Sequence, residues 1–179
     1  MIGAVVGQLR DERGMTLVEM CVVLVILGIL MVIAVASLQR ARLSANEASA
    51  IGSMKTINTA QISYASSCGG GNFAPTLVVL GHKPAGYRQS FITDDLAVAV
   101  TVQHSGYFVN IRDGAGASLG QVDCNGTDST TNYYASAVPV VQGKTGTRSF
   151  ATTQRAGIYF AEGLIPPPEP FGPPSQLVQ

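Results

Sequence analysis

The sequence predicts an α+β fold in which one long N-terminal helix packs on a small antiparallel β-sheet. No proline occurs between Met15 and Ala74, and up to Ser66 only Gly28 and Gly52 interrupt residues that favour a helix. Downstream, short β-branched and aromatic runs alternate with Gly, Asn and Asp, and no helical pattern separates them. At 179 residues the chain is one domain, or one small domain with extensions.

The first element is a helix from Met15 to about Ser66, which at 1.5 Å per residue is roughly 78 Å long. Its first part, residues 15–38, is expected to be a transmembrane or filament-core helix. The apolar run Leu17–Leu38 has 22 residues, enough to cross about 30 Å of hydrocarbon. A secretory signal peptide would have a shorter apolar core and a small-residue cleavage site after it. A simple signal anchor remains the alternative.

The second part of the same helix, residues 39–67, is amphipathic. Apolar side chains within about 140 degrees of one another predict a face that packs on a domain. These side chains are Ile51, Met54, Ile57, Ile62 and Ala65. The segment 68–72 contains three consecutive glycines, which offer the left-handed conformations that end a helix.

Residues 68–163 are expected to form an antiparallel sheet domain. The Ser105-Gly106 turn predicts a hairpin between the runs on either side of it. The expected strands are Leu96–Gln103, Tyr107–Arg112, Tyr133–Val141, Arg148–Thr152 and Gly157–Ala161.

The last segment, residues 164–179, is rich in proline. Proline lacks a backbone donor, so this segment cannot join the interior of a sheet. We expect a flexible tail, extended or disordered. A Pro-rich docking peptide is the functional alternative.

Charged residues make up only 12% of the chain and the net charge is zero. The chain as a whole therefore gives no electrostatic reason to bind nucleic acid. It also lacks a basic stripe with interleaved aromatic residues, so no specific nucleic-acid partner is predicted.

One carboxylate stands out because Glu19 lies at the start of the apolar run, shortly after Gly14. From Met20 to Ala36 no side chain is charged or strongly polar. A charge at the centre of a bilayer costs about 2.5–3.5 kcal/mol on insertion scales, so such residues are usually functional or paired. A cut after Gly14 would leave a cationic amine at Met15, one helical turn from Glu19. The two charges would be less costly to bury together than alone.

The run Gly14-Met15-Thr16-Leu17-Val18-Glu19, followed by an apolar helix, resembles the class III signal of type IV pilins and pseudopilins. The predicted layout also resembles that of pilins: a long helix, then a small antiparallel sheet domain, closed by a loop that contains a cysteine near the C-terminus. The resemblance implies that a membrane prepilin peptidase removes residues 1–14 as a leader and that Met15 becomes the N-methylated terminus. Met15 stands where Phe is commonest in the family, and no proline breaks the apolar helix.

The resemblance further implies that Glu19 of an incoming subunit pairs with the Met15 amine of its neighbour, which sets the axial register. The remaining apolar side chains would form the core of a helical homopolymer, with Gly28, Ala34 and Ala36 allowing close approach. The implied partners are copies of the same chain, the prepilin peptidase, the pilus assembly machinery of the inner membrane and, for the precursor, the membrane itself. The implied location is the bacterial inner membrane, then a cell-surface pilus or a periplasmic pseudopilus.

Of the three cysteines, Cys21 lies in the span and is expected to act as a small apolar side chain. Cys68 and Cys124 remain as a pair on the oxidising side of the membrane. A disulfide between them would close a loop of 57 residues and contribute about 4 kcal/mol on the chain-entropy model. Two free thiols are the alternative.

No metal, cofactor or catalytic residue is predicted. The turn 123–128 offers oxygen ligands, but it lacks the Gly and the closing Glu of an EF-hand, so a solvated turn is favoured over calcium. Lys144-Thr145-Gly146 matches one element of serine β-lactamases, whose other motifs are absent from the sequence. No serine or cysteine motif pairs with His82 or His104. We therefore expect a protein that is not an enzyme.

Three functions remain open at this point. The first is a structural subunit of a type IV pilus-like filament. The second is a pseudopilin of a type II secretion system. The third, of a different class, is a periplasmic binding domain that stays anchored in the membrane and never polymerises.

Overall fold

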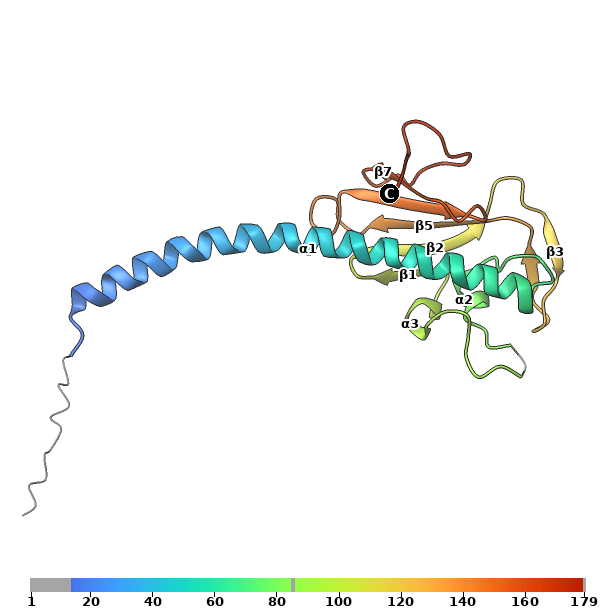
Figure 1. The fold of residues 1–179 in the computed structure, drawn as a ribbon, viewed down its shortest axis with the longest axis horizontal. Coiled ribbons are helices and arrows are strands. Elements are labelled where there is room, and N and C mark those ends of the chain that lie inside the picture. Colours follow the sequence, from blue (N-terminus) through green and yellow to red (C-terminus); the bar gives the residue numbers. More distant parts are fainter. Residues whose placement is uncertain (1–13, 85, 179) are drawn as a thin grey trace, which may run out of the picture. The chain divides into compact units, whose positions relative to one another are not determined.

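The first element, helix α1, runs without interruption from Leu17 to Ser67 in the computed structural model, which describes residues 14–84 and 86–178 (Figure 1). The predicted single long helix is therefore confirmed. Its end is set by glycine: the amides of Gly69 and Gly71 donate to the carbonyls of Tyr64 and Ala65, both at 2.8 Å. Gly70 and Gly71 have φ of 58° and 90°, in the left-handed region that side chains disfavour, so the helix ends before them, at Ser67.

The structure divides at Leu38/Gln39 into two units, and α1 contributes to both. We call residues 39–178 the head. Within the head, α1 lies along one face of an antiparallel sheet, and two short helices, α2 (Leu77–Leu80) and α3 (Asp94–Ala97), follow it in the chain (Figure 1). The predicted α+β layout is confirmed.

The main sheet of the described residues is antiparallel throughout. Some of its paired strands follow each other in the sequence, and others are separated by further strands. In pairing order its strands are β1 (Thr101–His104), β2 (Tyr107–Asp113), β5 (Tyr133–Pro139), β6 (Arg148–Thr153), β7 (Ile158–Glu162) and β8 (Gln176–Leu177). Strands β3 (Leu119–Val122) and β4 (Asp128–Thr130) form a separate hairpin. The predicted hairpin across Ser105-Gly106 is present, because Gln103 pairs with Phe108.

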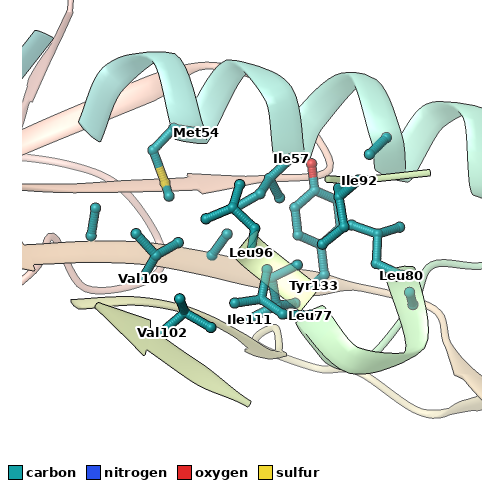
Figure 2. Close-up of a cluster of buried hydrophobic side chains, with 14 of the residues drawn as sticks. Met54, Ile57, Leu77, Leu80, Ile92, Leu96, Val102, Val109, Ile111 and Tyr133 are labelled. Carbon is teal, nitrogen blue, oxygen red and sulfur yellow. The ribbon is translucent and has the colours of Figure 1, made fainter. Parts of the chain in front are cut away.

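The core of the head lies between α1 and the sheet. Met54 and Ile57 are fully buried and point from α1 toward the sheet, where Val109 of β2 lies opposite (Figure 2). Leu77 of α2 and Leu96 of α3 close the same cluster. Burial of a side chain of this size stabilises a fold by about 1.5–3 kcal/mol, so this contact fixes α1 on the sheet.

Two buried amides on α1 were not part of the predicted apolar face. Asn58 accepts from the Tyr133 hydroxyl at 2.9 Å and donates to the Ala156 carbonyl at 3.0 Å. Gln61 exchanges two hydrogen bonds with the backbone of Ala74, at 2.8 and 2.9 Å. Since buried polar groups are tolerated when hydrogen-bonded, these amides can occupy the packed face. The predicted member Ile62 is instead 58% exposed, so its placement on that face was wrong.

The expected strand Leu96–Gln103 begins later than predicted. Its first residues belong to α3, and β1 starts at Thr101. Asp94 and Asp95 occupy the first turn of α3, where acidic side chains favour a helix start. The local acidic signal thus outweighs the β-propensity of the valines that follow.

The Pro-rich segment differs from the expected flexible tail. The Phe171 ring stacks on Tyr159 at a centroid distance of 4.3 Å, and the Pro167 carbonyl accepts from the Tyr134 hydroxyl at 2.6 Å. After the last proline, β8 pairs with β7 at the sheet edge. Proline is excluded from sheet interiors, but the aromatic side chains of the outer sheet face and the free edge of β7 give this segment a surface to pack on.

Candidate functional site

The predicted processing and assembly residues lie together at the start of α1. Gly14 and Met15 precede the helix, and Thr16 occupies its N-cap position. The Thr16 hydroxyl accepts a hydrogen bond from the Glu19 amide at 3.2 Å. This is half of a capping box, the Thr-x-x-Glu pattern that satisfies amides at a helix N-terminus. Glu19 therefore lies in the first turn, where the helix dipole favours a carboxylate.

Behind Glu19, α1 presents apolar side chains on every side. From Leu17 to Val35 its Leu, Val, Ile and Met side chains are all between 43 and 80% exposed. α1 is long and apolar enough to cross a membrane. A helix that is apolar all round must be covered by lipid or by other helices. At Gly28, an added Cβ would meet no atom within 4 Å, so this position is open in the single chain.

The comparisons with known proteins bear on this segment. The model of the prokaryotic N-terminal methylation motif matches residues 9–35. The chain carries a class III prepilin signal. This is the signal of type IV pilins and pseudopilins, and the resemblance drawn from Gly14–Glu19 is thereby confirmed. Neither the curated proteins nor the solved structures give a match to the chain.

The prepilin signal indicates a type IV pilin-like or pseudopilin-like subunit that is processed at its N-terminus. The pilins and pseudopilins that carry this signal are structural proteins. It also indicates a membrane-anchored precursor. The individual roles of Gly14, Met15 and Glu19 stay predictions, as do the partners in assembly.

The predicted disulfide between Cys68 and Cys124 is present, with the two Cα atoms 4.8 Å apart. It joins the end of α1 to the turn after β3. The same turn holds a second link, because the buried Asp123 carboxylate accepts from the Tyr64 hydroxyl of α1 at 2.8 Å. Burial, and then the hydrogen bond to Asp123 and the charge of that carboxylate, raise the pKa of Tyr64, so this phenol stays a hydrogen-bond donor.

The turn after β3 is exposed at residues 124–126, as expected of a solvated turn, and only its first residue, Asp123, is buried. The other carboxylate oxygen of Asp123 accepts from the amides of Asn125 and Thr127, at 2.9 and 2.7 Å. Asp123 thus uses both oxygens to hold protein groups. Within residues 14–84 and 86–178, no group of three or more His, Cys, Asp or Glu side chains is placed to hold a metal ion.

A charged cluster that sequence reasoning missed fixes the other end of the head to α1. The Glu47 carboxylate is buried and accepts from the amide and hydroxyl of Thr147, at 2.8 and 2.7 Å. Its second oxygen receives two hydrogen bonds from the Arg148 guanidinium, at 2.9 and 2.6 Å. Because the partners lie about a hundred residues apart in the chain, no local pattern could have revealed them.

The electrostatics of this cluster favour the ionised carboxylate. Burial alone raises the pKa of Glu47, but the hydrogen bonds from Thr147 and the Arg148 guanidinium outweigh it and hold that pKa below its usual value. The Arg148 guanidinium also lies over the Phe160 ring, 4.9 Å from its centroid. Glu47 is therefore an anchor between α1 and β6.

The other polar candidates have local structural roles. Thr145, in the Lys144-Thr145-Gly146 motif, closes a turn with Val141 and accepts a hydrogen bond from Asn46 of α1 through its carbonyl, at 3.0 Å. His104 at the end of β1 lies 3.2 Å from the Asp95 carboxylate. These contacts stabilise turns and element ends of the head.

Proposed function

We propose that this protein is a structural subunit of a type IV pilus-like filament, cut after Gly14 and polymerised through the apolar half of α1. The observation that carries the proposal is the position of the prepilin signal. Its cleavage site lies before the apolar run, so processing leaves the helix on the mature protein. The apolar run is exposed in the single chain, and neighbouring copies of the same helix would cover it.

The pairing of charges gives assembly its register. After cleavage the Met15 amine precedes the Thr16 cap and stands outside the hydrogen-bonded helix. Glu19 presents its carboxylate one turn further on. An amine and a carboxylate placed among apolar helices compensate each other's desolvation, and each would be costly alone. A subunit whose Glu19 meets its neighbour's amine is thus favoured over one that has slipped along the helix.

The test is electron microscopy of the sheared cell-surface fraction, combined with mass analysis of the N-terminus of its main protein. We expect filaments whose subunit begins at N-methylated Met15. Filaments that remain short and periplasmic, and cannot be sheared from cells, would indicate a type II secretion pseudopilin instead. An intact Met1 on surface protein would contradict both forms of the proposal and favour an anchored binding domain.

A further inference from the structure

A polar groove on the head lies beside the exposed face of α1. One wall is the α1 segment from Lys55 to Ser67, and the other is the segment 87–94 between α2 and α3. Its two larger hollows have volumes of about 670 Å³ each, and a third has about 330 Å³. All three share Phe91, so we call this the Phe91 groove.

Two aromatic side chains, Phe91 and Tyr87, line the groove. Phe91 is half-buried, and its ring meets Tyr64 edge to face with 5.5 Å between the centroids. This contact holds the ring in place while part of it lines all three hollows. Tyr87, which is 53% exposed, lines one of the larger hollows. Fixed aromatic faces of this kind pack against the apolar face of a flat or ring-shaped ligand.

The α1 wall offers hydrogen-bond acceptors. The exposed hydroxyls of Thr56, Thr59 and Ser63 each donate to the carbonyl four residues earlier, at distances of 2.9–3.1 Å. A hydroxyl has one hydrogen, so these three oxygens have only lone pairs left for a ligand. The wall therefore suits a ligand with many donors, such as a sugar with free hydroxyls.

The rim of the groove carries positive charge. Arg88 lines both larger hollows, Lys83 lines one of them, and Lys55 lines the smallest. All three side chains are exposed, and Asp94 lines one end of the groove. A guanidinium binds carboxylates with two parallel hydrogen bonds, so Arg88 gives the groove a site for an acidic group.

We propose that the Phe91 groove binds an acidic saccharide, a chain of uronic-acid units with ring hydroxyls and carboxylates. The ring face packs on Phe91, the hydroxyls donate to the α1 wall, and a carboxylate pairs with Arg88. The backbone of single-stranded DNA fits the α1 wall less well, because its phosphate and sugar oxygens only accept hydrogen bonds and the hydroxyls of the wall have no hydrogen left to donate. The inference concerns the head alone and does not depend on assembly into a filament.

The test is isothermal titration calorimetry of the full chain in detergent with a galacturonate hexamer. Maltohexaose serves as the neutral probe and oligothymidylate as the nucleic-acid probe. We expect saturable binding of the galacturonate and none of the other two. Arg88→Gln should raise Kd about tenfold, the effect of losing one charge-assisted contact.

The matched control is Arg155→Gln, because Arg155 is an exposed arginine on the turn between β6 and β7, outside the groove. It should leave Kd unchanged, and thermal unfolding should show that both variants fold as the parent does. The proposal is overturned if galacturonate binding does not saturate or if Arg88→Gln and Arg155→Gln have the same effect. Binding of oligothymidylate that depends on Arg88 would also overturn it and assign the groove to nucleic acid.

Discussion

Glu19 has a local role that the structure supports and an intermolecular role that we propose, and the two need different side-chain chemistry. The local one is helix capping: an acidic or amide side chain at this position of a capping box stabilises the first turn by about 0.3–1 kcal/mol. The intermolecular one is charge pairing with the amine of a neighbouring subunit, which only a carboxylate can provide. The amide Gln retains the first function and loses the second.

We therefore expect Glu19→Gln to behave like Glu19→Ala. Both variants should insert into the membrane normally and fail to build filaments, because both lack the charge. The measurement is the amount of sheared filament relative to the membrane precursor, by immunoblot. Normal filaments from Glu19→Gln, with loss only in Glu19→Ala, would assign Glu19 to capping and remove its role in register.

Glu47 links α1 to β6 through its hydrogen bonds with Thr147 and Arg148. Glu47→Gln keeps the size of the side chain but leaves Arg148 without its carboxylate. Hydrogen bonds to charged groups contribute about 1.5–3 kcal/mol, and Arg148 is 36% exposed, so we expect a loss of about 2 kcal/mol in the free energy of unfolding. Urea unfolding at pH 7 measures this, with the exposed Glu162→Gln as control.

The pH dependence of the same pair has a definite sign. The pKa of Glu47 is lowered in the folded protein, so its stabilisation is complete above the unfolded pKa, about 4.3. It is lost as the pH falls through the lower, folded value. The difference in unfolding free energy between the parent and Glu47→Gln should therefore shrink below about pH 4.3. A difference that stays constant down to pH 2.5 would show that the charge of Glu47 is not the stabilising group.

At the scale of elements, local signals were predictable from sequence, whereas the long-range pairings were not, apart from the disulfide between Cys68 and Cys124. The end of α1 was predicted because consecutive glycines act locally on backbone conformation. The same holds for the prepilin signal, whose residues all lie within one short segment. The anchors Glu47, Asn58 and Asp123 could not be found in this way, because each is buried only by virtue of partners far along the chain. Ile62 was wrongly placed on the packed face for the same reason. Hydrophobicity favours an isoleucine over an amide at a buried position, because it cannot show that the amide has a hydrogen-bond partner.

The Pro-rich segment, which was predicted to be a flexible tail, packs on the sheet in the structure, and mutation can test this packing. Phe171 stacks on Tyr159, whereas Ile165 of the same segment is 79% exposed. Phe171→Ala should lower the free energy of unfolding by about 1–2 kcal/mol, because it removes an aromatic pair and its buried area. Ile165→Ala is the matched control and should change it by less than about 0.5 kcal/mol. Equal, negligible effects of the two variants would restore the expected flexible tail.

At the scale of the whole molecule, the two units have different requirements for stability. The buried apolar core of the described chain begins at Ala50, and the anchors of the head begin at Asn46 and Glu47. A fragment from Gln39 to the C-terminus should thus fold alone, in water, with its disulfide. We expect a single cooperative thermal transition by circular dichroism and protected amides in β2 and β5. A fragment without a cooperative transition would mean that the head needs the apolar half of α1.

The apolar half of α1, by contrast, is exposed in the single chain, so lipid or other chains must cover it. Two glycines of α1 allow close packing against other chains to be tested. Gly28 and Gly52 are both helical, and an added Cβ at either meets no atom within 4 Å. Replacing either by Leu should therefore strengthen the isolated helix, because Gly costs about 1 kcal/mol there. In a filament held by close packing of apolar halves, Leu at position 28 would overpack every subunit contact, at about 1–3 kcal/mol each.

We expect Gly28→Leu to reduce sheared filaments at least about fivefold, as an overpacking cost of 1 kcal/mol or more requires, and Gly52→Leu to leave them near normal. Both variants should show parental levels of membrane precursor and parental thermal unfolding of the head. The readout is filament yield by electron microscopy and immunoblot. Equal yields from the two variants would mean that position 28 faces lipid or solvent in the assembled state, and the close-packed helical core would then have to be abandoned.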